Sequence, residues 1–201
     1  SCLDAFMEVY HAPTIHKDTV NILLDGNAMA AGLLKNGHSR MVTPKKMNLD
    51  GGFLGAEDSD YVPYIDTCDK IHAQTNVAYG MFPNFITPTD TSGYPAILFW
   101  PKGLKETEFE WTQLAPKWPG DEKPDYWNEQ ETSFDSIMDE DFQNLEPMQR
   151  SHDAGVFESM PLNYQERRIY YYHQVIDDWI GRDNLPENIQ VPNVLDPFIE
   201  I

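Results

Sequence analysis

Strand-like segments follow one another between residues 76 and 116. NVAYGMFPNFITP (76–88) is rich in aromatic and β-favouring residues, and a turn-like TDTSGYP comes after it. AILFWP (96–101) is a short apolar run, and ETEFEWTQLAP (106–116) alternates glutamate with Thr, Phe and Trp. The pattern predicts an antiparallel sheet of several strands, one of which has an acidic face in water.

Two helices are expected after these strands. Residues 115–131 carry prolines and tryptophans and predict a connection, whereas 133–150 predicts a helix with Ser133 as its N-cap. The segment 163–182 predicts a clearer helix, which Gly181 ends. The face of this helix expected to pack in the core consists of Ile169, Tyr172, His173, Ile176 and Ile180. Strands followed by closing helices indicate an α+β fold.

The amino-terminal part fits more than one assignment. Residues 4–11 are compatible with a helix, which Pro13 ends because it disfavours helical geometry at the residue before it. Residues 17–37 fit either short helices or strand–turn pieces, 39–46 predict a short strand, and 48–71 predict a surface loop or lid.

The length of 201 residues fits one domain, and 41% hydrophobic residues indicate a globular chain. Fifteen prolines and twelve glycines argue against a purely helical bundle. The chain opens inside the helix-like SCLDAFMEVYH, without an evident N-cap. We therefore expect a single domain over residues 1–201 that is truncated at its N-terminal side.

The formal charge of −19 argues against partners that carry negative charge. Such a surface repels phosphate backbones and anionic lipid, so neither nucleic acid nor a membrane surface is an expected partner. Two cysteines, Cys2 and Cys68, are too few for a disulfide framework or a cysteine-based metal site. A reducing cytoplasm is the expected compartment.

EVYHAPTIH places His11 and His16 five positions apart. On a continuous helix these side chains would point about 140° apart and could not share an ion. Pro13 turns the chain out of the helix and makes a shared ion feasible. The spacing alone is weak, because two of six histidines fall this close in many chains by chance.

Asp141 supplies a better clue. An apolar stripe at helical spacing contains Met138, Asp141, Leu145 and Met148. A carboxylate that faces a core costs several kcal/mol unless it is paired, protonated or bound to a cation. In the alternative interpretation, the stripe is centred on Ile137 and Phe142, and Asp141 is exposed.

Two neutral imidazoles and one carboxylate, with open positions beside them, are typical of non-haem Fe(II) oxygenases. Zinc accepts similar ligands and would activate water instead. The residue types therefore leave both metals open.

DAFMEVYHAPTIH resembles the H-x4-H segment in the catalytic α-subunit of Rieske-type aromatic ring-hydroxylating oxygenases, where a carboxylate precedes the first histidine by three residues. MDEDFQNLEPMQR is similar to the acidic segment that completes the family's iron site. FPNF and ERRIYYYHQVIDDWI also look like family sequence, and the resemblance covers most of residues 1–182.

The resemblance implies a helix-grip (START-like) fold, in which a curved antiparallel sheet surrounds a long C-terminal helix. It makes His11, His16 and Asp141 the iron ligands. Glu8 matches the carboxylate that carries electrons to the iron, although this position is usually Asp; Asp4, one turn earlier, is the alternative bridge or a pocket residue.

The resemblance also implies partners. Electrons would reach Fe(II) from a Rieske [2Fe–2S] cluster on another subunit of a homo-oligomer, a trimer, and a ferredoxin or reductase would feed that cluster from NAD(P)H. The cluster needs C-x-H and C-x-x-H motifs, which neither cysteine provides, so its domain is expected outside this chain. The substrates would be O₂ and a small aromatic or apolar molecule; a separate β-subunit stays open.

Two other functions compete with the oxygenase. A helix-grip module without a metal would bind a hydrophobic ligand and tolerate Asp141→Ala. A zinc-dependent hydrolase would use the same ligands and need no redox partner.

Overall fold

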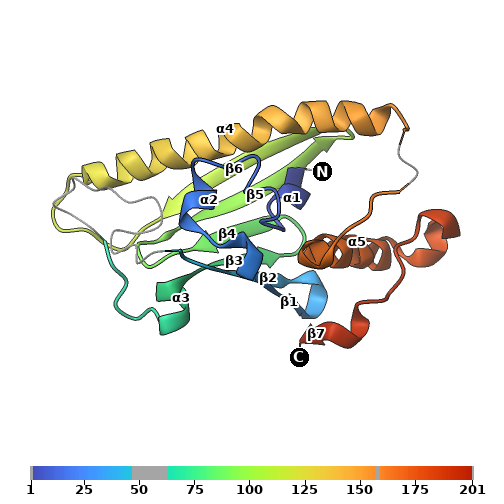
Figure 1. Cartoon of the computed structure of the whole chain (residues 1–201), viewed down its shortest axis with the longest axis horizontal. Coiled ribbons are helices and arrows are strands. Elements are labelled where there is room, and N and C mark those ends of the chain that lie inside the picture. The colour runs from blue at the N-terminus through green and yellow to red at the C-terminus, as the bar shows by residue number, and fades with distance from the viewer. Residues whose placement is uncertain (1, 47–62, 157–158, 201) are drawn as a thin grey trace.

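The computed structural model describes residues 2–46, 63–156 and 159–200. It confirms the α+β class: a curved, unclosed seven-stranded sheet carries the long helix α4 (Asp125–Asp153) (Figure 1). The strands are β1 (Ala30–Leu34), β2 (Ser39–Pro44), β3 (Thr75–Met81), β4 (Phe85–Thr89), β5 (Tyr94–Gly103), β6 (Glu106–Leu114) and β7 (Ile199–Glu200).

The sheet has the strand order β6-β5-β4-β3-β2-β1-β7. Neighbouring strands from β1 to β6 pair antiparallel, while β7 pairs parallel with β1. The predicted strands at 39–46, 76–88, 96–101 and 106–116 are all present, and the second of them is a hairpin of β3 and β4. The glutamates of β6 are exposed, as the alternation predicts.

The other helices are short apart from α5 (Arg167–Ile180). The α-helices are α1 (Cys2–Ala5), α2 (Val20–Leu23) and α3 (Lys70–Gln74). The 3₁₀ helices are η1 (Gly26–Ala28), η2 (Lys35–Gly37), η3 (Tyr164–Glu166), η4 (Arg182–Asn184), η5 (Glu187–Ile189) and η6 (Asp196–Phe198).

The helix predicted over 4–11 is wrong beyond Ala5, because the chain continues as a series of turns to His16. The backbone N–H groups of Thr14 and Ile15 both donate to the carbonyl of His11, which bends the chain sharply at Pro13. This bend brings two histidines, five residues apart, onto one side of the segment.

α4 begins eight residues earlier than the sequence predicts. Residues 125–131 are helical rather than a connection, and Ser133 lies inside the helix instead of capping it. The reason is the burial of Tyr126 and Trp127, whose exposed fractions are 0% and 2%. The apolar surface that these two aromatic side chains bury in the first turn stabilises this start of the helix by several kcal/mol.

α5 begins and ends as predicted. Asn163 and Glu166 form a capping box just before it, and Gly181 ends it with φ +88°. The predicted core face is confirmed only in part: Ile169 and Tyr172 pack against the main core, whereas Ile180 is exposed. The fully buried side chains lie beside this face and include a charged residue: Arg168, Tyr171, Gln174 and Val175.

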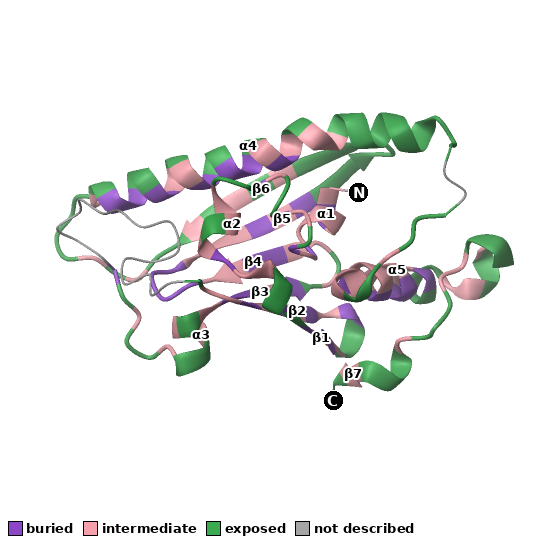
Figure 2. Cartoon of the chain, in the orientation of Figure 1, coloured by how far each residue is buried: buried purple, intermediate pink, exposed green. Residues whose placement is uncertain are grey.

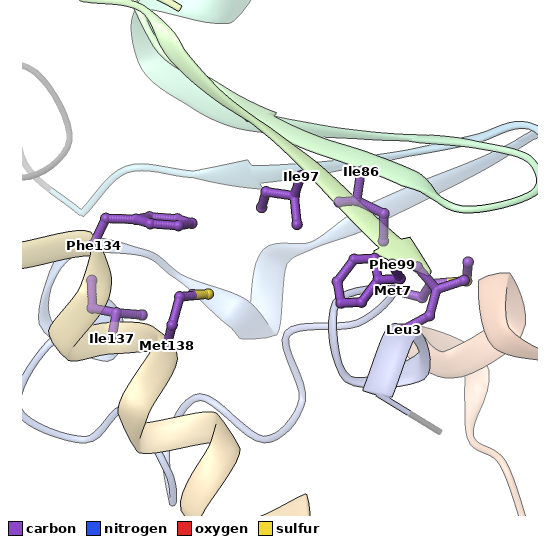
Figure 3. Close-up of a cluster of buried hydrophobic side chains, with 8 residues drawn as sticks. All are labelled: Leu3, Met7, Ile86, Ile97, Phe99, Phe134, Ile137 and Met138. Atoms are coloured by element: carbon purple, nitrogen blue, oxygen red, sulfur yellow. The ribbon is translucent and has the colours of Figure 1, made fainter. Parts of the chain in front are cut away.

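The main core lies between α4, the amino-terminal segment and the middle of the sheet. Figure 3 shows Phe134, Ile137 and Met138 of α4 pointing toward Ile97 and Ile86 of the sheet. Leu3, Met7 and Phe99 complete this cluster. Along α4 the buried residues run from Tyr126 to Asp141, and the carboxyl-terminal end is exposed (Figure 2).

Residues 47–62, most of the predicted loop or lid at 48–71, lie outside the described residues. Of the remainder, 63–69 form neither helix nor strand, and α3 begins at Lys70. Within the described part of the chain, no helix combines the length and apolar character needed to cross a membrane.

Candidate metal centre

His11, His16 and Asp141 lie together, although the last is distant in sequence. One potential ligand atom from each lies within 4.8 Å of the others. Asp141 Oδ1 is 3.2 Å from His16 Nε2 and 3.5 Å from His11 Nε2. Ligands at right angles around an ion, each about 2.1 Å from it, would be roughly 3 Å apart. The spacing therefore fits neighbouring positions on one divalent cation.

The burial of Asp141 decides between the two stripes. Its exposed fraction is 7%, so the alternative with an exposed Asp141 is wrong. The stripe itself is shorter than expected, since Met148 is 51% exposed. Asp141 stands at the end of the buried face of α4, where the amino-terminal turns meet the helix.

Nδ1 of each imidazole is hydrogen-bonded to a glutamate carboxylate. Glu8 Oε1 is hydrogen-bonded to Nδ1 of His11, and Glu140 Oε2 lies 2.6 Å from Nδ1 of His16. The hydroxyl of Thr19 donates to the same Glu140 oxygen at 2.7 Å. A carboxylate that accepts from Nδ1–H fixes the tautomer and leaves the Nε2 lone pair free for a metal.

The charges also favour a cation. Three carboxylates surround two imidazoles. Burial acts to lower the pKa of His16, but the hydrogen bonds and negative charges of Asp141 and Glu140 together raise it above its usual value. The site therefore attracts positive charge, which a proton on His16 or a metal ion can supply. Two nitrogens and one carboxylate oxygen match the donor set of a non-haem Fe(II) or zinc site.

Asp4 lies elsewhere. Its Oδ1 is 3.2 Å from Nε2 of His173 on α5. Although burial acts to raise it, the pKa of Asp4 is lowered, and the hydrogen bond to His173 contributes to this shift. The His173 side chain is 41% exposed, so it is not the packed core histidine that the sequence predicts.

A cavity of about 160 Å³ adjoins the three residues. Glu8, His11, His16 and Asp141 line it, and Asp4 is not among the lining residues. Much of the remaining wall is apolar and comes from the sheet, α4 and the amino-terminal segment, for example Val9, Met41, Ile86, Phe134 and Met138. Such a site can hold a small apolar molecule beside a metal.

Glu140 and Thr19 are the residues of this site that sequence reasoning missed. Glu140 precedes Asp141 directly, and its position off the apolar stripe predicts a solvated carboxylate. No local signal joins it to His16, which is 124 residues away; only the fold does so.

Comparison with known proteins agrees with this geometry. The sequence model of a family described as "Ring hydroxylating alpha subunit (catalytic domain)" matches residues 1–182. Among curated proteins, none matches the chain significantly.

Proposed function

Because the chain belongs to the family of ring-hydroxylating alpha subunits, matching its catalytic domain over residues 1–182, we propose that it inserts oxygen from O₂ into a small aromatic or similarly apolar substrate. The family is one of Rieske oxygenases and implies a non-haem iron. The observation that carries the proposal is the convergence of His11, His16 and Asp141 at the end of an apolar cavity.

His11, His16 and Asp141 would hold Fe(II) through Nε2, Nε2 and Oδ1. When bound, the iron would supply the activation of O₂, with electrons delivered from outside the domain. The protein's part is to orient both imidazoles with Nε2 toward the site, which the carboxylates on Nδ1 achieve. Asp141 would supply the one carboxylate ligand among the three.

Glu8 is the proposed entry for electrons. Its carboxylate accepts hydrogen bonds from Nδ1–H of His11 and from the backbone N–H of His11, which lies 3.1 Å from Glu8 Oε2. The Glu8 side chain is only 10% exposed. A direct hydrogen bond to a candidate ligand imidazole suits this role.

The remaining partners follow from the family rather than from contacts of this chain. We propose a Rieske [2Fe–2S] cluster on a domain outside these 201 residues, presented by a neighbouring copy in a trimer. A ferredoxin or reductase would supply it from NAD(P)H. The free thiols of Cys2 and Cys68 are compatible with the reducing cytoplasm that the sequence predicts.

Nitric oxide tests the oxygenase directly, because it binds Fe(II) at the position that O₂ would take. Anaerobic protein loaded with Fe(II) should give the EPR signal of an iron–nitrosyl, and an apolar aromatic compound in the cavity should change that signal. Protein that holds Fe(II) yet gives no nitrosyl signal would contradict an open oxygen-binding position. Ester hydrolysis by the zinc-loaded protein would favour the hydrolase instead.

A further inference from the structure

The cavity beside the three candidate ligands has a polar end, which the reaction chemistry does not use. The polar side chains there belong to Asn76, Asp90, Ser92, Gln113 and Gln130. Gln130 and Asp141 lie eleven residues apart on α4, and therefore on one face, about 16 Å apart along the helix axis. The polar end is thus remote from the position of the metal.

The turn after β4 forms part of this end. A Cβ placed on Gly93 would lie 3.3 Å from the ring of Trp127 and 3.3 Å from the side-chain nitrogen of Gln113. The turn that contains Asp90 and Gly93 therefore sits against the first turns of α4, one turn from Gln130.

Only one of the two carboxylate oxygens of Asp90 accepts hydrogen bonds from the described residues. Its Oδ1 accepts from Lys45 Nζ at 3.2 Å, from the backbone N–H of Thr91 at 2.5 Å and from the Thr91 hydroxyl at 3.0 Å. Its Oδ2 is buried and has no hydrogen-bond partner among the described residues. The whole residue is only 8% exposed.

Gln130 also has a buried polar atom that is left unsatisfied. It is 8% exposed, and its Nε2 is buried without a partner in the part of the chain that the structure describes. A buried donor and a buried acceptor left unsatisfied each cost about 1–3 kcal/mol. Both residues line one cavity, so a single ligand group that accepts from Gln130 and donates to Asp90 would satisfy the two together.

We propose that this end of the cavity selects an elongated substrate with a neutral hydrogen-bonding group, a hydroxyl or primary carboxamide, remote from the carbon that is oxidised. The inference rests on the proposed function and specifies its substrate class. A hydroxyl can accept from Gln130 Nε2 and donate to Asp90 Oδ2. A carboxylate is disfavoured, because it would place its lone pairs against those of Asp90 in a buried site.

Isosteric probes separate this selection from simple apolar binding. The test compares 4-methylbiphenyl, 4-hydroxybiphenyl, biphenyl-4-carboxamide and biphenyl-4-carboxylate by anaerobic calorimetric titration of the Fe(II)-loaded chain and of the metal-free chain. We expect the hydroxyl and carboxamide probes to bind at least about tenfold more tightly than the methyl probe, and the carboxylate to bind weakest.

Gln130→Leu removes the donor at nearly constant volume, and Gln143→Leu on the exposed side of α4 is the matched control. In Gln130→Leu the preference for hydroxyl over methyl should fall to about twofold or less, while the control keeps it. Asp90→Asn is a second variant: the three donors on Oδ1 hold the amide oxygen there, so its NH₂ replaces Oδ2 and should strengthen carboxylate binding about tenfold.

Equal affinity for methyl and hydroxyl probes would overturn the inference, and so would failure of the hydroxyl and carboxamide probes to bind. An unchanged preference in both variants would show that ordered water, rather than ligand, satisfies the two atoms. None of these results depends on iron content. Loss of the selection with iron retained would refute only this inference, whereas absence of iron with the selection intact would refute only the proposed reaction.

Discussion

At the scale of the residue, the candidate site depends on which nitrogen of each imidazole is free. Glu8 and Glu140 each hold an Nδ1, so both Nε2 atoms face Asp141 Oδ1. The three candidate ligands could be predicted from H-x4-H and from the family pattern, and the structure brings them together. The carboxylates that orient them could be predicted only in part, because Glu140 meets His16 through tertiary structure alone.

Glu140→Gln tests this orientation. The amide keeps the shape of the side chain but can present its NH₂ to His16, which would favour the wrong tautomer. Affinity for Fe(II) should fall about 10–100-fold, as measured by anaerobic competition with a chelator. Glu129→Gln, an exposed position on the same helix, should leave the affinity unchanged. Equal affinities in wild type and Glu140→Gln would show that His16 is oriented by other means.

At the scale of the element, the sheet was predictable because alternation and β-favouring residues act locally. The start of α4 was not, because Tyr126 and Trp127 stabilise helix in a segment whose prolines predict a loop. The buried face of α5 was predicted only in part for a related reason: Arg168 lies fully buried in it, at 0% exposure. Periodicity assigns an arginine to the surface, and only the acceptors provided by other elements make its burial stable.

Arg168 joins α5 to the segment that carries Glu8. Its guanidinium donates to the carbonyl of Met7 at 3.0 Å and to Ser39 Oγ at 3.0 Å, with a longer contact of 3.4 Å to the carbonyl of Ala78. Burial lowers the pKa of Arg168 to about 9, so the side chain stays charged at neutral pH.

Arg168→Met keeps much of the volume but leaves three buried acceptors unpaired. The free energy of unfolding should fall by about 2 kcal/mol in urea titrations of the metal-free chain. Fe(II) affinity should fall as well, since Met7 adjoins Glu8. Arg150→Met, whose partner Glu146 is exposed, should change the stability by less than about 0.5 kcal/mol. A similar loss in both variants would contradict the special position of Arg168.

At the scale of the whole molecule, the candidate centre joins parts that are far apart in sequence. His11 and His16 lie on the amino-terminal turns, Asp141 lies on α4, and the cavity between them is closed by the sheet. The family resemblance predicted this assembly and its fold class. The polar end of the cavity was not predictable, because Asp90 and Gln130 come together only through packing of the turn after β4 against α4.

A metal that links these parts should stabilise the folded chain. At a free Fe(II) concentration a hundredfold above the dissociation constant, the free energy of unfolding should rise by about 2.7 kcal/mol. Anaerobic urea titrations with and without Fe(II) measure this difference. Stability that does not respond to Fe(II) would contradict a metal site formed only in the folded state.

The most direct measurement is the iron content of anaerobically purified protein, compared with Asp141→Ala and with Glu146→Gln as the exposed control on the same helix. We expect about one iron per chain in wild type and in the control, and a loss of iron in Asp141→Ala with the fold intact by circular dichroism. Zinc at that stoichiometry would favour the hydrolase. No metal in the folded wild-type protein would contradict the oxygenase site and favour a module that binds hydrophobic ligands.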